Sequence, residues 1–325
     1  MTHKILVATR SFGSTSSKPW DVLKDAGIDW IKADMDQKMT EDRMISLLQD
    51  VDGCIIGVVP MTARVLENAP RLKVICFHGV GVDFIDRSTA AHLGIIIANC
   101  PGANNESVAD LAIGLMLAAA RNVVAADRSL RQGRWESFGG VDLWKKTLGL
   151  IGYGHIGRSV ARRALGFDMN VLVFDPFIPS DSIEPYVRFV SLDELLAESD
   201  FVSIHAALTP GNQNMIGTAQ FARMNRSAYL INTARGGLVD ENCLYQAHKE
   251  GQIAGAGLDA FVAEPLGNSP LFELSNVVFT PHLGAHTRES VERVGIMAAQ
   301  NVVQVLQGGT PLHQVRFDPS TEVKR

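Results

Sequence analysis

The sequence predicts an α/β fold built from two doubly wound parallel-sheet domains. The chain has 325 residues, which is more than one ordinary hydrophobic core serves. Short β-branched runs alternate with helical patterns in the first hundred residues, as in parallel βα units. A second series of the same kind begins at Thr147, after a long apolar helical pattern. Together these observations favour two α/β domains over a single one.

The first series contains four short apolar runs separated by helical patterns. Strands are expected at residues 5–7, 54–56, 74–77 and 95–97, and helices at 20–26, 39–48, 64–68 and 86–93. None of these strands is followed by the glycine-rich turn that binds a phosphate. The first half is therefore predicted to be a small, flavodoxin-like domain.

The stretch from Ser107 to Gly133 is a nearly unbroken helical pattern rich in Ala and Leu. Its most apolar part, Val108 to Ala120, contains Asp110 and stops at Arg121, so it is too short to span a bilayer. We expect a buried helix that links the domains and offers an apolar face to a second subunit.

The second series continues with further strands and ends in a helical pattern. Strands are expected from residue 147 and at 171–174, 201–205, 229–232, 255–258 and 277–280. The last helical pattern, 288–307, is expected to return to the first domain. This gives a discontinuous first domain, residues 1–100 plus 289–325, and a second domain of residues 101–288. Residues after Gly308 are expected to form a loosely held tail.

The run from Leu148 to Gly157 has the form of a nucleotide-binding turn. Gly152 permits a sharp turn after the strand, and Gly154 lets backbone N–H groups approach a pyrophosphate. Gly157 allows the following helix to pack closely on the strand. Asp175 ends the next strand, where a carboxylate accepts the hydroxyls of a ribose and repels a 2′-phosphate. The second domain is therefore predicted to be Rossmann-like and to bind NAD in preference to NADP.

Composition excludes several classes of partner and site. A net charge of −5 with 20% charged residues argues against a nucleic-acid or membrane surface as the main partner. The four cysteines, Cys54, Cys76, Cys100 and Cys243, are scattered, which predicts reduced thiols in a cytoplasmic protein. The first residues lack the apolar core of a signal peptide.

Three polar groups follow strands of the second series and should meet at one sheet edge. Arg235 stands where it can hold a carboxylate through two parallel hydrogen bonds. Glu264, in the segment from Gly257 to Pro265, can orient the imidazole of His282 and raise its pKa, leaving the other ring nitrogen for proton exchange with an alcohol.

At these positions the sequence resembles the D-isomer-specific 2-hydroxyacid dehydrogenase family, in its phosphoglycerate dehydrogenase-like form without a C-terminal regulatory domain. The resemblance covers nearly the whole chain. The matching segments are 78–83, 99–110, the glycine turn, His205 with 208–210, 232–241, Asp259 with 264–265, and 280–284.

The resemblance implies an NAD-dependent oxidoreductase acting on the CH–OH group of donors. It would transfer a hydride between NAD(H) and C2 of a small D-2-hydroxy acid or 2-oxo acid, such as glycerate, hydroxypyruvate or glyoxylate, in the cleft between the domains. Arg235 would bind and polarise the 2-oxo acid, His282 would be the general acid and base, and Glu264 would orient it. The backbone of Val80 and Gly81 would hold the substrate carboxylate, making the first domain the substrate-binding one. Cofactor contacts are implied for Ser107, Gly152, Gly154, His155, Ile156, Gly157, Asp175, His205, Ala206, Thr233, Ala234, Arg235, Asp259, His282 and Gly284. A homodimer is also implied.

Two departures from the family pattern bear on the substrate and on metal binding. Val59 and Phe77 stand where phosphoglycerate dehydrogenases carry arginines, so D-3-phosphoglycerate is the alternative substrate, requiring a cation from Arg131, Arg134 or a partner subunit. His286 lies four residues after His282, a spacing that a metal pair can use, but no third ligand is near and no metal is expected. An alternative of another class is an NAD-sensing, corepressor-like interaction protein on the same scaffold.

Overall fold

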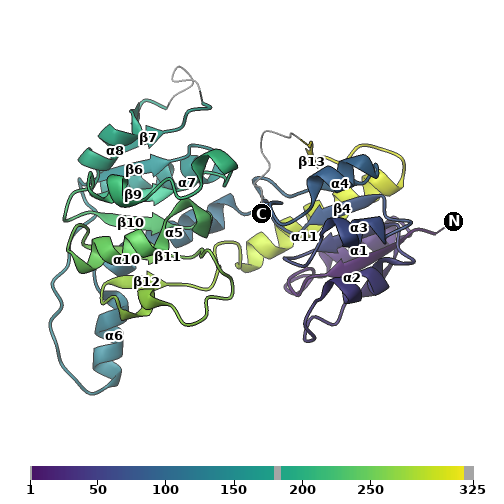
Figure 1. Cartoon of the computed structure of the whole chain (residues 1–325), viewed down its shortest axis with the longest axis horizontal. Helices are drawn as coiled ribbons and strands as arrows, with labels where there is room; N and C mark the ends of the chain where they lie inside the picture. The colour runs from purple at the N-terminus through teal and green to yellow at the C-terminus, as the bar shows by residue number, and fades with distance from the viewer. Residues whose placement is uncertain (1, 179–183, 318–325) are drawn as a thin grey trace. The chain divides into compact units, whose positions relative to one another are not determined.

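The computed structural model describes residues 2–178 and 184–317, which form two compact units. Unit 1 comprises Met1–Asn104 and Ala285–Arg325, and unit 2 comprises Asn105–Gly284. Each unit contains a parallel sheet with helices packed on it (Figure 1). The expected fold class of two parallel-sheet α/β domains is confirmed. The predicted domain boundaries stay a prediction.

The sheet of unit 1 has the order β13-β5-β4-β3-β1-β2, and its strands are parallel except for β13. β1 and β3 are neighbours, while β2 and β4 lie on opposite sides of that pair. The connections from β1 and β3 therefore lead away in opposite directions, which makes a topological switch point between them. The strands are β1 (Lys4–Ala8), β2 (Asp29–Lys32), β3 (Gly53–Ile56), β4 (Val74–Phe77), β5 (Ile96–Ala98) and β13 (Gln314–Val315).

Helices cover both faces of this sheet. Alternate residues of β1 enter different cores: Leu6 joins one cluster, and Ile5 and Val7 join the other. The first cluster is covered by α2 (Glu41–Leu48), α3 (Ala63–Glu67) and α4 (Arg87–His92), and the second by α1 (Lys18–Asp25) and α11 (Arg288–Leu306).

The sheet of unit 2 is fully parallel, with the order β12-β11-β10-β9-β6-β7-β8 and its switch point between β6 and β9. Its strands are β6 (Thr147–Ile151), β7 (Asn170–Phe174), β8 (Val187–Phe189), β9 (Phe201–Ile204), β10 (Tyr229–Asn232), β11 (Gly255–Leu258) and β12 (Val277–Phe279). Its helices are α5 (Asn105–Ala120), α6 (Val123–Arg131), α7 (His155–Ala164), α8 (Leu192–Glu198), α9 (Thr218–Phe221) and α10 (Glu241–Lys249), with 3₁₀ turns η1 (Leu165–Phe167), η2 (Pro210–Asn212), η3 (Gly236–Leu238) and η4 (Pro270–Glu273).

The single helix expected from Ser107 to Gly133 is wrong, because the chain breaks between α5 and α6. Asn122 adopts a left-handed conformation with φ of 53°, and the two helices meet at 62°. Asparagine tolerates this conformation better than most residues, which the apolar pattern does not reveal. Among the described residues no single helix is long and apolar enough to cross a membrane; α5 and α6 reach that length only as this bent pair.

Three edge or near-edge strands were not expected from the sequence. β2 is largely exposed and lacks an apolar run, and β8 is short and half-exposed. β13 lies in the segment expected to be a loose tail, where it pairs antiparallel with β5. The end of that tail, residues 318–325, lies outside the described residues. Each of these strands is held by its pairing with a neighbouring strand. The residues within a strand predict such pairing poorly.

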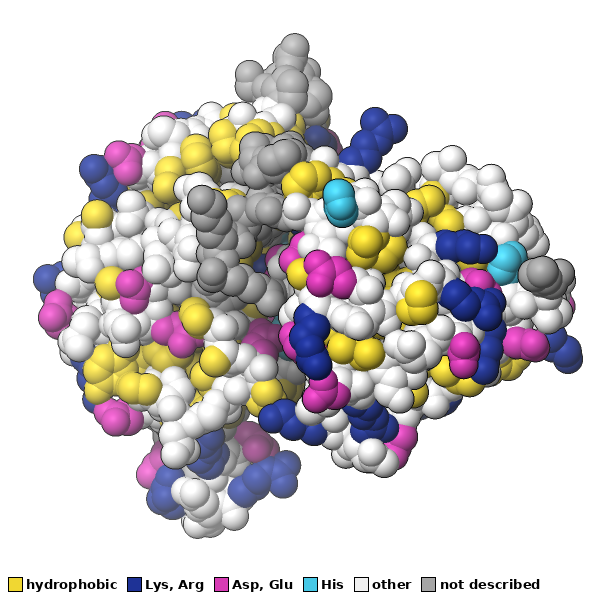
Figure 2. All heavy atoms as spheres, turned by 45° about the vertical axis from the view of Figure 1, so that its right-hand side comes forward, with side chains coloured by type: hydrophobic (Ala, Val, Ile, Leu, Met, Phe, Trp, Pro, Cys, Tyr) yellow, Lys and Arg dark blue, Asp and Glu magenta, His cyan; other side chains and the backbone are white. Residues whose placement is uncertain are grey.

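Charged side chains of both signs share the surface. On the face shown in Figure 2, Lys and Arg are interspersed with Asp and Glu. Neither sign of charge covers that face alone.

Candidate active site

The glycine turn forms where β6 ends, beside the switch point of unit 2. Gly152 has φ of +95°, and a Cβ there would lie 2.7 Å from the backbone nitrogen of Ala206. Both facts exclude a side chain, because contacts under 3.0 Å do not occur for real Cβ atoms. The turn after β6 and the segment His205–Ala206 after β9 are therefore packed backbone to backbone.

The N-terminus of α7 presents unused hydrogen-bond donors. Gly154 is the N-cap and supplies no side-chain cap, and a Cβ on it would meet nothing within 4 Å. Within the described residues, the N–H groups of His155 and Ile156 have no acceptor. An uncapped helix start with open space before it suits a phosphate group.

Two further polar atoms near this edge are buried without a partner in the described part of the chain. They are Nδ1 of His205 and Oγ1 of Thr233. His205 shares a hydrogen bond of 2.9 Å between its Nε2 and Ser203 Oγ, and burial lowers its pKa to about 3. The imidazole is therefore neutral at pH 7, and its free nitrogen remains able to bind a ligand.

Asp175 follows β7 and turns its carboxylate toward the glycine turn. One oxygen accepts the Tyr153 N–H at 2.8 Å, and the other accepts the Phe177 N–H at 2.9 Å. These bonds hold the carboxylate beside the turn, with lone pairs left for further donors. The tyrosine hydroxyl donates to Glu184 at 2.8 Å, a contact that the sequence motif did not indicate.

His282 and Glu264 form a hydrogen-bonded pair in unit 2. Nδ1 of His282 lies 2.8 Å from Oε2 of Glu264. Burial opposes ionisation of the glutamate, but hydrogen bonds from His282 and from the Phe261 N–H outweigh it, so the pKa of Glu264 is lowered. An ionised carboxylate only accepts, so Nδ1 carries the proton and the lone pair of neutral His282 is on Nε2.

The hydrogen bond to Glu264 also raises the pKa of His282, against the opposing effects of burial and of the Arg235 charge. The charge of Arg235 lowers the pKa of both members of the pair. Arg235 begins the turn after β10, and its Nη1 donates to the carbonyl of Ala234 at 2.8 Å. The predicted meeting of Arg235, Glu264 and His282 is thus present within unit 2.

Gly236 allows the loop that carries Glu264 to lie against the turn that carries Arg235. A Cβ on Gly236 would lie 1.9 Å from the carbonyl carbon of Phe261. Glu241 supports the same loop by accepting the Val262 N–H at 2.8 Å. The segment from Asn232 to Glu241 therefore positions Glu264 as well as Arg235.

Asp259 anchors the turn that contains His282. It is 1% exposed, and its carboxylate accepts the Thr280 hydroxyl at 2.6 Å and the N–H groups of Leu283 and Gly284 at 2.7 and 2.9 Å. All three bonds join Asp259 to the turn around His282. Asp259 therefore stabilises this turn, in addition to the cofactor contact predicted for it.

In unit 1, the loop after β4 exposes backbone donors. The carbonyl of Gly79 accepts from the Cys100 N–H at 2.7 Å, and that of Val80 accepts from Asn99 Nδ2 at 2.7 Å. Within the described residues, the N–H groups of Val80 and Gly81 have no acceptor. With its carbonyls tied down and its N–H groups available, this loop can bind an anion.

The remaining predicted residues lie at the following places. Ser107 is buried at the start of α5, Ala234 follows Thr233 after β10, and Gly284 is held by Asp259. Arg131 pairs with Asp127 and Arg134 with Glu136.

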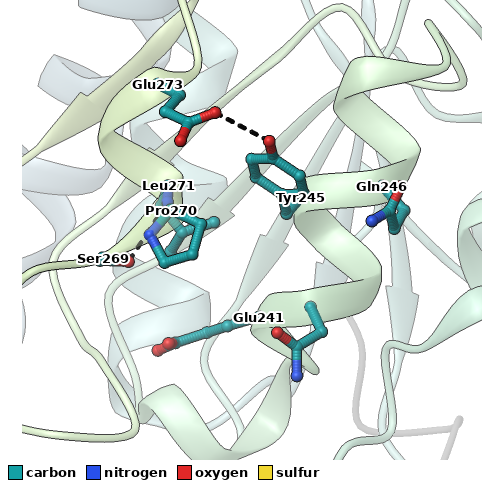
Figure 3. A pocket seen from close by; sticks show the side chains of 8 residues that line it. Glu241, Tyr245, Gln246, Ser269, Pro270, Leu271 and Glu273 are labelled. Carbon is teal, nitrogen blue, oxygen red and sulfur yellow. Dashed lines mark hydrogen bonds between the residues drawn. The ribbon is translucent and has the colours of Figure 1, made fainter.

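Unit 2 also contains a cavity of about 410 Å³ between α10 and η4. Figure 3 shows Tyr245 donating to Glu273 across it, a bond of 2.8 Å. Glu241 lines the same cavity but is already engaged with Val262.

Comparison with known proteins identifies the family. The family description "D-isomer specific 2-hydroxyacid dehydrogenase, NAD binding domain" matches residues 113–284. The chain belongs to the D-isomer specific 2-hydroxyacid dehydrogenases. A glyoxylate reductase of Korarchaeum cryptofilum is 42% identical over 299 residues, covering 90% of this chain and 87% of that protein.

Two further comparisons show how far the likeness extends. A D-3-phosphoglycerate dehydrogenase of Methanocaldococcus jannaschii is 44% identical over 83% of this chain, which spans only 52% of that relative's length. A crystal structure of a Thermus thermophilus protein has a TM-score of 0.87 and 36% identity, covering 96% of this chain and all of that one.

The NAD-binding domain of the family lies in unit 2, and its residues fit the cofactor. The uncapped start of α7 suits the pyrophosphate, and Asp175 next to the turn suits a ribose. The unpartnered atoms of His205 and Thr233 could form hydrogen bonds with the same ligand, and these two contacts stay predictions. The prediction of NAD as the cofactor is confirmed.

Proposed function

We propose that this dehydrogenase interconverts a small 2-hydroxy acid and its 2-oxo acid, such as D-glycerate and hydroxypyruvate, or the achiral glycolate and glyoxylate. The pairing of His282 with Glu264 at 2.8 Å, beside Arg235, carries the proposal. NAD, when bound, accepts or supplies the hydride.

Each polar group has a distinct task in this proposal. The N–H groups of Val80 and Gly81 take the substrate carboxylate, and Arg235 takes the substrate oxygen as negative charge develops on it. Nε2 of His282 donates a proton to that oxygen during reduction and removes it during oxidation. Glu264 keeps the other imidazole nitrogen protonated and stabilises the imidazolium form.

The test is consumption of NADH with a panel of 2-oxo acids, glyoxylate and hydroxypyruvate among them. We expect turnover with at least one, and a loss of about two to four powers of ten in kcat for His282→Ala with NADH binding retained. An NAD-sensing interaction protein would bind NADH without consuming it. Binding without turnover across the panel would therefore refute the proposal.

We also propose a homodimer formed through α6 and the segment that follows it. Leu130 of α6 is 58% exposed and Trp135 is 93% exposed, and such large apolar surfaces are normally covered by a partner. Light scattering after size-exclusion chromatography is expected to give twice the chain mass, and Leu130→Asp with Trp135→Ser to give a monomer. A wild-type chain that is monomeric at micromolar concentration would contradict this.

The same proposal places the protein in the cytoplasm. All four cysteines are unpaired and three are buried, as in a reducing compartment. Localisation of a tagged full chain would test it, and recovery outside the cytoplasm would overturn it.

A further inference from the structure

We propose that a cavity in unit 1 is a subsite for a second anionic group of the substrate, a carboxylate or a phosphate remote from the reacting carbon. The cavity measures about 500 Å³ and lies among the loops after β1 and β3 and the start of α11. The inference rests on the proposed dehydrogenase function and names the class of acid that the enzyme takes.

The cavity occupies the place where open α/β sheets bind ligands. Its lining includes Thr9 and Ser11 after β1, and Gly57 and Val58 after β3. β1 and β3 are the neighbours between which the connections diverge, so the cavity lies at the switch point and at the carboxyl ends of the strands.

The charge of the lining selects an anion. Arg10, His286 and Arg288 line the cavity, and no Asp or Glu is among the described residues that do, although the whole chain carries −5. Within the described residues, the guanidinium of Arg288 makes no hydrogen bond or ion pair. Arg10 pairs with Asp36 at 2.6 Å, but both side chains are well exposed, and such a pair is weak enough to open for a ligand.

Neutral donors complete the cavity wall. Thr9 Oγ1 and Ser11 Oγ lie 3.0 Å apart, and Ser11 Oγ lies 3.1 Å from Nδ1 of His78. Burial lowers the pKa of His78 to about 4, so this imidazole orients the serine without adding charge. α11 begins at the cavity with its positive end, and its length of 19 residues gives it a full helix dipole.

The cavity and the loop of Val80 and Gly81 can be bridged by one small molecule. That loop follows β4, which pairs with β3, and β3 pairs with β1. Neighbouring strands lie about 4.8 Å apart, so the two sites are separated by about 5–10 Å along the sheet edge. An acid of about three to five carbons has that reach.

This subsite changes what the absence of arginine at Val59 and Phe77 implies about the substrate. Those positions lack arginine, but Arg10 and Arg288 reach the same sheet edge from other segments. The cationic charge expected to be missing is therefore supplied by residues that family motifs do not include.

The experiment compares three 2-oxo acids with the full chain and NADH: hydroxypyruvate, oxaloacetate and 3-phosphohydroxypyruvate. Their far ends carry a hydroxyl, a carboxylate and a phosphate. We expect kcat/KM for one of the two anionic acids to exceed that for hydroxypyruvate at least tenfold, and the better one identifies the anion. Arg288→Gln should lower that kcat/KM about tenfold, equivalent to about 1.4 kcal/mol, and change hydroxypyruvate less than about twofold.

Arg71→Gln is the matched control, because Arg71 contacts Asp52 just before β3, at the amino edge of the same sheet. Arg71→Gln should leave the ratios of kcat/KM among the three acids unchanged. The proposal is overturned if kcat/KM for both anionic acids is below that for hydroxypyruvate. It is also overturned if Arg288→Gln lowers kcat/KM equally for all three acids or for none of them.

A binding measurement separates this proposal from the proposed function. Calorimetric titration with inorganic phosphate and with malonate should show binding to the wild type and weaker binding to Arg288→Gln. If these anions bind in this way while no 2-oxo acid is turned over, the anion site stands and the dehydrogenase proposal fails. Equal binding by wild type and variant would refute the site.

Discussion

Replacing Gly236 by alanine tests whether the loop contact around this glycine sets the geometry of His282 and Glu264, the pair that we propose transfers the proton. The added Cβ would lie 1.9 Å from the carbonyl carbon of Phe261, 2.2 Å from the Val262 nitrogen and 2.3 Å from the Phe261 oxygen. All three are backbone atoms, so no side-chain rotation can relieve the contact. Ordinary contact begins near 3.4 Å, so the loop must retreat by about 1.5 Å.

That movement would carry Glu264 with it, because its Oε1 accepts the Phe261 N–H at 3.0 Å. The hydrogen bond to His282 would lengthen or break, and a catalytic group misplaced by about 1 Å costs about a hundredfold in rate. We therefore expect Gly236→Ala to lower kcat about a hundredfold. The affinity for NADH should change less than kcat, because the added Cβ would displace the loop at Phe261 and Val262 and would not touch the glycine turn.

Gly237→Ala is the matched control. Its Cβ would meet the side chain of Leu208 at 3.0 Å, and this flexible end can rotate away. Steady-state kinetics, NADH fluorescence titration and thermal unfolding of both variants complete the assay. A folded Gly236→Ala enzyme with kcat close to that of Gly237→Ala would refute the reasoning.

Three further outcomes follow from the site. Glu264→Gln weakens the hydrogen bond that raises the pKa of His282, so the imidazolium required for reduction is lost at lower pH. The rate of oxo-acid reduction should therefore decline at a lower pH than in the wild type, and an unchanged pH profile would contradict this. Asp175→Ala should narrow the preference for NADH over NADPH, measured as the ratio of kcat/KM values, and an unchanged ratio counts against its ribose role. Arg235→Ala should reduce kcat/KM severely while NADH still binds, whereas near-normal turnover would remove the arginine from the reaction.

The sequence predicted what short motifs encode. The glycine turn and Asp175 are specified by a few residues around two strands, and Arg235, Glu264 and His282 each follow a strand of one parallel sheet. Because the carboxyl ends of parallel strands share an edge, their convergence could be inferred without coordinates.

The missed features depend on segments that are distant in sequence or on one backbone angle. The cavity of unit 1 joins Arg10 to Arg288, which lie at opposite ends of the chain. The break after α5 rests on the left-handed conformation of Asn122 within an apolar run. The packing of Gly236 on Phe261 is invisible in a motif that contains only the glycine.

The position of His282 relative to Glu264 depends on Asp259, which holds the turn that contains the histidine. His282 is one of few non-glycine residues with a positive φ, 54°, a conformation that costs about 1–3 kcal/mol unless the surroundings enforce it. Asp259 supplies that enforcement: its backbone carbonyl accepts the His282 N–H at 3.1 Å, and its buried carboxylate binds the turn at Thr280, Leu283 and Gly284. Since Asp259 directly follows β11 and the turn follows β12, the pairing of these two strands fixes the imidazole before any ligand arrives. The strained backbone and the buried aspartate therefore act together: they direct Nδ1 at Glu264 and leave Nε2 for the proton transfer that we propose.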